Sequence, residues 1–247
     1  MTLARATTTD GAILYDPARI RTPSVADFDA VALARLGRTA PTPAGRGSSW
    51  FVTPADGTAG RWVLRHYRRG GLVAPLLPAA LHDRYLWTGE PSTRCFRELV
   101  LLAELERRSL PAPRPVAAHY ARSGPTYRAD LLTVEIEGAR SLSSLLGELG
   151  DEDWRRVGEC LRRFHDAGLW HADLTAHNLL FDRTRRVHLI DFDRARLGSA
   201  PVPAYGNLAR LTRSLAKVTR HRPAVRDANG WARLREGYDG PRGDPPR

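Results

Sequence analysis

Hydrophobic and polar positions alternate over short distances in the first half of the chain. Residues 48–52 and 61–67 are rich in β-forming side chains and lie on either side of a turn, a pattern typical of paired strands. Residues 127–136 alternate in the same way and predict a further pair of strands. Residues 1–40 show little regular pattern, and the Thr- and Pro-rich run at 39–44 is typical of a linker. The N-terminal part is therefore predicted to contain a small sheet.

Apolar residues recur at helical spacing in four segments. Residues 92–108 carry such a stripe, and closely spaced prolines follow it, so a helix is predicted to end there. Residues 142–149 and 153–167 predict two more helices, the second of which Gly168 can end. Residues 207–218 predict a late amphipathic helix. Most of the expected helices thus lie in the C-terminal half.

A short hairpin is predicted between the third and fourth of these helices. Residues 179–182 and 187–191 are its two apolar strands. The order of strands, helix, strands and then helices around a hairpin is typical of an α+β fold with a small β-rich N-lobe and a helical C-lobe. We expect residues 1–137 to form the N-terminal lobe and 138–247 the C-terminal lobe. The Gly-, Pro- and Asp-rich tail from Gly237 is expected to fray.

Composition narrows the class of protein. The 247 residues are enough for a two-lobed domain, and the 42% hydrophobic and 26% charged fractions are those of a globular chain. The sequence contains no run of about 18 apolar residues, so no membrane-spanning helix is predicted. The polar N-terminus lacks an apolar signal core, so a cytoplasmic location is expected. Cys95 and Cys160 lie far apart in the sequence, without C-x-x-C spacing, and are therefore expected to be inert thiols in a reducing compartment.

The formal net charge of +11 indicates an anionic partner, either nucleic acid, an anionic membrane surface or a phosphorylated substrate. Lys217 is the only lysine among the 38 basic residues. A GC-rich genome would favour arginine over lysine in this way, but it does not explain the net excess. Arginine also suits bidentate recognition of phosphate and carboxylate groups.

The strongest chemical signal is a polar loop, residues 171–178, that leads into the predicted hairpin. It reads H-x-D-x-x-x-x-N, and the hairpin ends in Asp191-Phe192-Asp193. Asp173 could orient an attacking hydroxyl and accept its proton, while Asn178 and Asp191 offer oxygen ligands that suit Mg²⁺. This layout resembles the catalytic loop and metal-binding Asp of protein-kinase-like phosphotransferases. It predicts phosphoryl transfer and a bilobal protein-kinase-like fold.

Three neighbours of these residues are expected to play supporting or substrate-contacting roles. His171 is expected to support the loop rather than to react. His177 could be structural or could contact the substrate. Asp193 replaces the glycine of the usual D-F-G motif, and it could fix the loop or bind Arg194 or Arg196.

A glycine-containing segment could cover the phosphates of ATP. Residues 45–52 fit G-x-G-x-x-x-x-V, and glycines let backbone amides approach phosphate oxygens closely. On its own this pattern is explained better by a plain hairpin, but the catalytic motif reverses that preference. Trp50 occupies the place of the expected third glycine, so the loop must differ in detail. The residues expected to bind ATP here are Gly45, Arg46, Gly47, Ser48 and Ser49.

A kinase-like fold also needs a cation on the strand after the glycine loop, paired with a glutamate on the next helix. The only lysine lies far downstream, so an arginine must serve. Arg65 stands where V-A-x-K would place the lysine, and Arg68, on the opposite face of the strand, is the alternative. Glu98 is the expected helix partner because it lies near the buried face, and Glu90 and Glu104 suit the role less well. A solvated surface pair is the alternative interpretation.

Together these segments resemble the 3-deoxy-D-manno-octulosonic acid (Kdo) kinases of lipopolysaccharide assembly. The resemblance covers roughly residues 40–220, and its combination of motifs is more specific than any one of them. An arginine in place of the strand lysine is a trait of that family, so it does not argue against activity. The matching segments are residues 45–52, R-H-Y-R-R-G-G at 65–71, 83–85, 93–98, 113–118, 127–133, H-A-D-L-T-A-H-N at 171–178 and L-I-D-F-D at 189–193.

The resemblance implies a peripheral enzyme at the cytoplasmic face of the inner membrane. It would use ATP and Mg²⁺ to phosphorylate the 4-hydroxyl of a Kdo residue on a Kdo–lipid A precursor. Residues 65–87 mix arginines with leucines and aromatic residues, which suits an anionic, lipid-bearing interface, although a helix packed on the N-lobe fits equally well. No nucleic-acid partner is expected, and the protein is expected to be a monomer.

Two alternatives stay open. The nearest is a kinase of the same fold with another acceptor: a heptose, an aminoglycoside, a fructosamine or a protein. The short stretch after Asp191, which has no A-P-E motif, argues against a protein kinase. A second alternative is a non-catalytic basic scaffold for nucleic acid or membrane, which would not turn over ATP.

Overall fold

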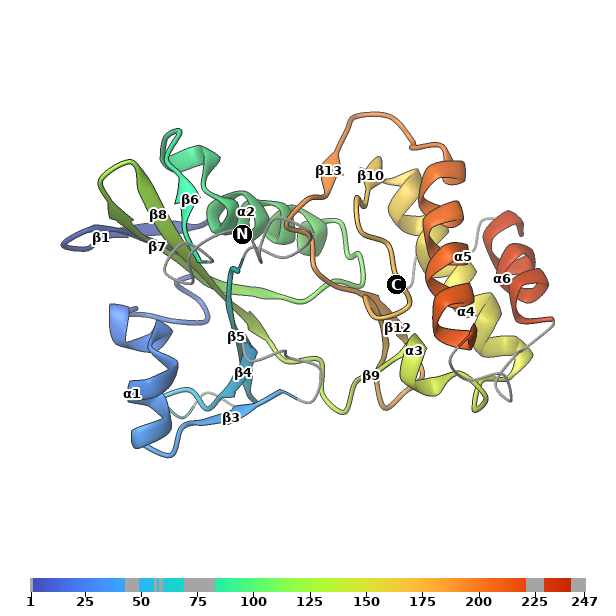
Figure 1. Cartoon of the computed structure of the whole chain (residues 1–247), viewed down its shortest axis with the longest axis horizontal. Helices are drawn as coiled ribbons and strands as arrows, with labels where there is room; N and C mark the ends of the chain where they lie inside the picture. The colour runs from blue at the N-terminus through green and yellow to red at the C-terminus, as the bar shows by residue number, and fades with distance from the viewer. Residues whose placement is uncertain are drawn as a thin grey trace. The chain divides into compact units, whose positions relative to one another are not determined.

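The computed structural model describes residues 2–42, 49–55, 57, 60–68, 83–220 and 229–240. The chain forms two compact units (Figure 1). The first comprises Met1–Arg107 and Pro113–Glu135, and the second comprises Arg108–Ala112 and Ile136–Arg247. Most described strands belong to the first unit and most helices to the second, so the predicted α+β class is confirmed. The units divide close to the expected boundary at 137.

The first unit is built on an antiparallel sheet. Its strands run in the order β1-β2-β7-β8-β5-β4-β3, and β6 pairs with β8. The predicted strands at 48–52 and 61–67 are β4 and β5, which pair antiparallel. The strands are β1 (Ala4–Thr7), β2 (Gly11–Tyr15), β3 (Thr39–Pro41), β4 (Ser49–Val52), β5 (Trp62–His66), β6 (Tyr85–Leu86), β7 (Pro115–Ser123) and β8 (Thr126–Val134).

The N-terminal segment is more ordered than the sequence pattern predicted. Residues 1–40 contribute β1, β2, the 3₁₀ helix η1 (Val25–Phe28) and α1 (Ala30–Arg35), and the expected linker begins with β3. These elements are too short to show a period, and β2 pairs with β7, far along the chain. Residues 127–136 also do not form a strand pair, because β8 is one strand whose neighbour β7 is rich in alanine. The predictions of a linker from residue 39 and of a strand pair at 127–136 were wrong, because the strands that pair with these segments are remote in the sequence or weakly patterned.

Both faces of this sheet are covered. On one face, Leu64 and Leu132 pack with Ile13, Phe28 and Leu33 from the N-terminal segment. The other face meets α2 (Arg94–Arg107), which follows the short 3₁₀ helix η4 (Glu90–Ser92) and contacts β7 and β8. The helix predicted at 92–108 is therefore confirmed. Its apolar stripe is buried against the sheet, which brings the side chains of its inner face to β5.

The second unit is mainly helical and contains two small sheets, in the orders β12-β11-β9 and β10-β13. The predicted hairpin is confirmed, since β11 and β12 pair antiparallel. The predicted fraying from Gly237 was wrong for the residues up to Asp239, because they lie in α6. The elements are β9 (Arg140–Ser141), α3 (Leu142–Leu145), α4 (Asp151–Asp166), β10 (Leu169–Trp170), β11 (Leu179–Phe181), β12 (Val187–Leu189), β13 (Arg196–Leu197), α5 (Ala204–Arg220) and α6 (Gly230–Asp239).

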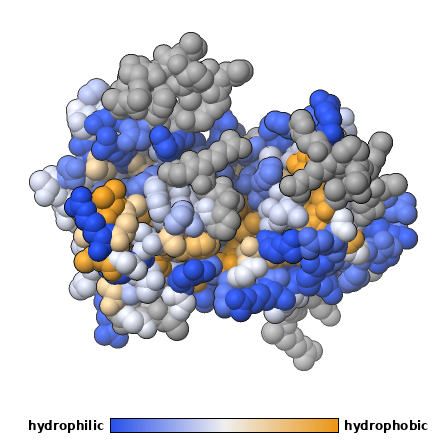
Figure 2. All heavy atoms as spheres, turned by 60° about the horizontal axis from the view of Figure 1, so that its bottom comes forward, coloured by the Kyte–Doolittle hydropathy of each residue, from blue (hydrophilic) through white to orange (hydrophobic). Residues whose placement is uncertain are grey.

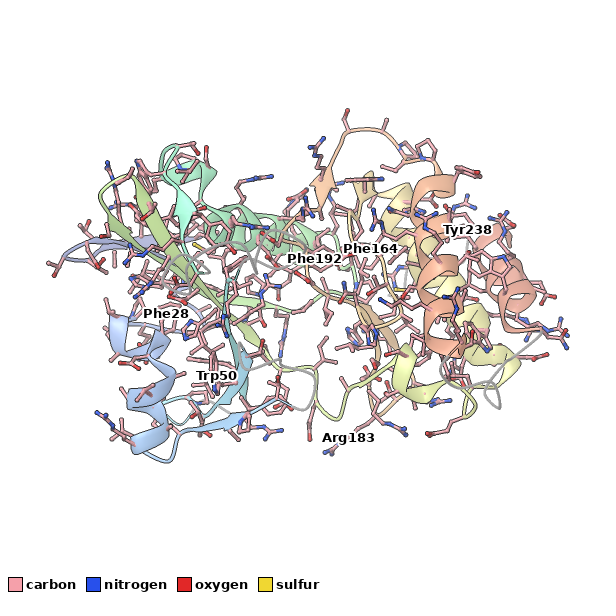
Figure 3. All side chains as sticks on the ribbon, in the orientation of Figure 1. Phe28, Trp50, Phe164, Arg183, Phe192 and Tyr238 are labelled. Carbon is pink, nitrogen blue, oxygen red and sulfur yellow. The ribbon has the colours of Figure 1, made fainter. Side chains whose placement is uncertain are left out.

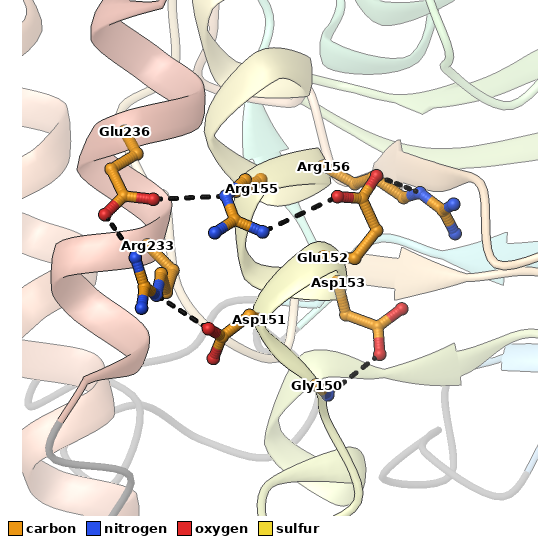
Figure 4. Close-up of polar contacts among 8 residues, drawn as sticks. All are labelled: Gly150, Asp151, Glu152, Asp153, Arg155, Arg156, Arg233 and Glu236. Atoms are coloured by element: carbon orange, nitrogen blue, oxygen red, sulfur yellow. Dashed lines mark hydrogen bonds and ion pairs between the residues drawn. The ribbon is translucent and has the colours of Figure 1, made fainter.

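Helices α4 and α6 approach each other closely at two glycines. A Cβ atom on Gly158 would lie 2.0 Å from the carbonyl oxygen of Leu234, and one on Gly237 would lie 2.1 Å from that of Arg155. Ion pairs flank this contact, with Arg155 3.1 Å from Glu236 and Arg233 2.8 Å from Asp151 (Figure 4). The last described helix is thus fastened to α4, which in turn contacts β10 and β12.

On the face shown in Figure 2, hydrophilic residues predominate and hydrophobic ones form separate patches. No described helix has the length and apolar composition of a membrane span. Of the segment expected to contact a membrane, residues 69–82 lie outside the described residues. In the remainder, Tyr85 is buried and Leu86 is 69% exposed.

Candidate active site

The loop at residues 171–178 connects β10 to β11 and is fastened to the end of β12. The Asn178 side-chain amide donates a hydrogen bond from Nδ2 to the backbone oxygen of Asp173, 2.9 Å away. The backbone oxygen of Asn178 accepts a hydrogen bond from the Ile190 amide, also at 2.9 Å. Asp191 follows Ile190 directly. Two hydrogen bonds therefore link the backbone of Asp173, through Asn178, to the residue before Asp191.

The residues at this point fit a divalent cation with oxygen ligands. Because Nδ2 of Asn178 donates to Asp173, the amide oxygen is the atom that could bind a cation. Asp191 has a φ of +67°, a left-handed conformation that Asp tolerates better than most residues. Among the described residues, no group of three His, Cys, Asp or Glu could hold a metal. One carboxylate and one amide suit Mg²⁺, which usually completes its octahedron with phosphate and water oxygens.

His171 supports this loop through hydrogen bonds from its buried ring, as expected. It is 2% exposed, with Nε2 3.1 Å from the Ile190 carbonyl oxygen and Nδ1 3.3 Å from the Asp173 amide nitrogen. Since the amide can only donate, Nδ1 accepts and Nε2 carries the proton, so the ring is neutral. Burial lowers the pKa of His171, in agreement with that form. Its ring contacts Phe192, which packs on Phe164, the two labelled near each other in Figure 3.

A second support comes from α5, from a residue that the sequence motifs do not include. Asn207 is 1% exposed and binds both backbone groups of His171: Oδ1 accepts from the amide at 3.1 Å, and Nδ2 donates to the carbonyl at 2.8 Å. The same Oδ1 lies 3.0 Å from Nε2 of His165, whose Nδ1 lies 2.7 Å from the Tyr238 hydroxyl. The available signal was a polar residue at the start of an otherwise apolar helix face. This chain of contacts links α6, α4 and α5 to the loop.

Further contacts fix the middle of the loop. Nδ1 of His177 lies 2.8 Å from the hydroxyl of Ser143 on α3, which favours a structural role. The Ala176 amide donates to the Ser214 hydroxyl on α5 at 3.1 Å. Arg210, also on α5, approaches the carboxylate of Asp173 to 3.7 Å. Helix α5 therefore both holds the loop and places a cation beside Asp173.

The first unit contains the expected ion pair between strand and helix. Arg65 on β5 pairs with Glu98 on α2, and the Tyr67 hydroxyl donates to the same carboxylate at 2.6 Å. Glu98 is 3% exposed. The Arg65 guanidinium also lies 4.5 Å from the centre of the Tyr67 ring. Burial and then the neighbouring carboxylate raise the pKa of Tyr67 well above its usual value, so Tyr67 remains a donor.

The alternative residues are placed elsewhere. Glu90 pairs with Arg5 at 2.8 Å, and Glu104 pairs with Arg107 at 2.7 Å. Arg68 is exposed and lies beyond the end of β5. Only Glu98 among the three glutamates considered thus meets Arg65, although contact between this pair and a nucleotide stays a prediction.

Most of the expected glycine loop lies outside the described residues, namely Gly45, Arg46, Gly47 and Ser48. Ser49 begins β4 directly opposite Arg65 on β5. The expected contacts of these five positions with ATP therefore stay predictions.

Comparisons with known proteins point to one family. The model of the lipopolysaccharide kinase (Kdo/WaaP) family matches residues 33–238. The 3-deoxy-D-manno-octulosonic acid kinase of Stenotrophomonas maltophilia (strain K279a) is 44% identical over 235 residues, covering 93% of this chain and 90% of that protein. The protein of the same name from Xylella fastidiosa (strain 9a5c) is 43% identical over 236 residues, with the same coverage.

Among solved structures, the Cydia pomonella granulovirus kinase PK-1 aligns with a TM-score of 0.43 and 14% identity, over 71% of this chain and 60% of that one. The family model spans the loop at 171–178 and the positions of Arg65 and Glu98, and the two relatives each cover 93% of the chain. The chain belongs to the lipopolysaccharide kinase (Kdo/WaaP) family.

Proposed function

We propose that the protein is an ATP-dependent kinase that phosphorylates the 4-hydroxyl of a Kdo residue on a Kdo–lipid A precursor, during assembly of the lipopolysaccharide core. The observation that carries this proposal is the hydrogen-bonded link from Asp173 through Asn178 to the residue before Asp191. Family membership supports the kinase activity, and the name shared by the relatives supports Kdo as the acceptor sugar.

In this mechanism Asp173 receives the acceptor hydroxyl. Its side chain is 55% exposed, so an incoming sugar can reach it, while its backbone is held by Asn178 and His171. The carboxylate orients the hydroxyl and accepts its proton as the phosphate is transferred. Because phosphoryl transfer needs little covalent chemistry from the protein, most of the rate enhancement comes from placement and electrostatic stabilisation.

Asn178 and Asp191 would hold Mg²⁺, which would neutralise charge on the phosphates when bound. Arg65 supplies a second positive charge toward the nucleotide. Its guanidinium stays protonated at any working pH, and the buried carboxylate of Glu98 together with the Tyr67 ring restricts where it can point. The glycine segment at 45–49 would cover the phosphates.

We also propose that the enzyme works at the cytoplasmic face of the inner membrane. The net charge of +11 and the exposed Leu86, close to Arg84, support attraction to an anionic, partly apolar surface. Reversing the charges of Arg68 and Arg69 is expected to weaken binding to anionic vesicles. Unchanged binding would remove this part of the proposal.

The test of the proposed function is transfer of labelled phosphate from ATP to a panel of acceptors, with and without Mg²⁺. Wild-type protein should label the Kdo–lipid A precursor, and Asp173→Ala should lower kcat by about two to four decades, the scale of a lost acid–base group. Since Asp173 is exposed, the variant should keep the wild-type Tm. Near-normal turnover by the variant would refute the role of Asp173, and labelling of a heptose acceptor instead would refute the substrate.

A further inference from the structure

Helix α5 differs from the other long helices in its charges. In α4 and α6, arginines pair with acids of the same helix, as Arg162 does with Asp166 at 2.8 Å and Arg235 with Asp239 at 2.7 Å. The 17 residues of α5 include no Asp or Glu. Its basic residues are Arg210, Arg213, Lys217 and Arg220.

These four residues, the basic stripe of α5, lie along one side of the helix. Spacings of three, four and three residues return to the same face at 3.6 residues per turn, and the stripe is about 15 Å long at 1.5 Å per residue. All four side chains are exposed. Like charges at these spacings repel one another, so the stripe is a surface whose charge is unbalanced within the helix.

The stripe begins at the catalytic carboxylate. Arg210 lies 3.7 Å from Asp173, and both side chains are about half exposed. On the adjoining edge of α5, Asn207 and Ser214 bind the loop that carries Asp173. Within the described part of the chain, the other three members of the stripe make no ion pair or side-chain hydrogen bond. Helix α5 thus presents positive charges that start beside the reacting group and extend away from it.

We propose that the basic stripe of α5 binds the anionic groups of the acceptor. The inference rests on the proposed function, because an acceptor that reaches Asp173 with its hydroxyl must lie beside the stripe. A sugar acid carries a carboxylate close to its hydroxyls, within reach of Arg210 and Arg213. The phosphates of the lipid-linked acceptor would meet Lys217 and Arg220. Guanidinium groups match carboxylates and phosphates in bidentate geometry, and the lysine acts as a point charge.

The test compares two double variants that remove the same charge. Arg213→Ala with Lys217→Ala removes the two middle charges of the stripe and leaves Arg210 in place beside Asp173. Arg156→Ala with Arg235→Ala is the matched control, because these arginines lie on helices α4 and α6 of the same unit and are 40% and 43% exposed. Equal Tm values would show that both variants fold.

Kinetics are measured with labelled ATP and Kdo–lipid A precursor in neutral detergent micelles. The stripe variant should raise the KM for the acceptor about tenfold to a hundredfold, the scale of one or two lost charge-assisted hydrogen bonds, while the KM for ATP stays within about twofold. The control should keep both values. Arg220→Ala alone should shift the acceptor KM in the same direction by a smaller factor.

A second measurement separates the acceptor from the bilayer. Both variants are tested for binding to phosphatidylglycerol vesicles that contain no acceptor. If the stripe variant loses vesicle binding but keeps the wild-type acceptor KM, the stripe contacts bulk lipid and the proposal is wrong. Unchanged acceptor KM without any vesicle effect also overturns it. If wild-type protein transfers no phosphate to the Kdo acceptor, the proposed function itself fails, a result distinct from normal transfer with an unaltered KM.

Discussion

Replacing Asn207 by alanine tests how the second unit holds its catalytic loop. The substitution removes three contacts at once, to the amide and the carbonyl of His171 and to the imidazole of His165. A buried polar group left without its partner costs about 1–3 kcal/mol. Water and small shifts will satisfy some of these groups, so we expect the free energy of unfolding to fall by about 2–4 kcal/mol in total.

The same change should slow catalysis by more than the loss of stability explains. His171 is the first residue of the loop, and Asp173 follows two residues later. Misplacing a catalytic group by about 1 Å can cost a hundredfold in rate. We therefore expect kcat for Asn207→Ala to fall by about two decades, with the KM for ATP little altered. Phosphate transfer is measured at a temperature where urea titration shows the variant to be folded.

Leu211→Ala is the matched control for this experiment. Leu211 lies on the same helix one turn later and is 0% exposed. Its truncation leaves a cavity and costs about 2–5 kcal/mol, a similar loss of stability without any change to the bonds on His171. If both variants lower kcat equally after correction for the folded fraction, Asn207 acts through stability alone and the reasoning is wrong.

Three further outcomes are expected. Glu98→Gln removes a buried carboxylate but keeps its shape, so it should destabilise the first unit by about 1–3 kcal/mol and raise the KM for ATP in steady-state assays; an unchanged KM would argue against a role in nucleotide binding. Gly158→Ala places a methyl group 2.0 Å from a carbonyl oxygen of α6 and should lower stability by about 1–3 kcal/mol in denaturant titrations, whereas Gly206→Ala, which meets no atom within 4 Å, should be neutral or stabilising. Burial lowers the pKa of His165, His171 and His188 below the usual 6.5. As the pH drops through 6.5, the unfolded chain therefore takes up protons before the folded chain does, and Tm should fall. A flat Tm between pH 8 and 5 would contradict this.

The parts of the site that could be predicted depend on short-range rules. Asp173 and Asn178 share one loop, and a short hairpin separates them from Asp191, so spacing alone predicts the hydrogen-bonded link from Asp173 through Asn178 to Ile190. Strand alternation put Arg65 and Arg68 on opposite faces and left the choice between them open, whereas the helical period predicted that Glu98 lies on the buried side of α2, where it pairs with Arg65. In each case the geometry follows from the local backbone, which the sequence pattern reports well.

The parts that were missed depend on remote partners. Strand β2 has five residues and is stabilised by β7, about a hundred positions later, so its own pattern carries little signal. Asn207 looks like an ordinary helix residue until the backbone of His171 is placed beside it. Helix α6 contains glycines that would normally weaken a helix, but their lack of a side chain is what allows the close approach to α4.

The position of β7 between β2 and β8 has a consequence for synthesis of the protein. The ribosome completes β2 long before it reaches β7, and at about 5–20 residues per second the interval is about 5–20 s. During this time the β1–β2 hairpin is an open edge that can pair with other chains. The yield of folded enzyme therefore depends on how well that edge is shielded in the nascent chain, before any of the catalytic loop has been made.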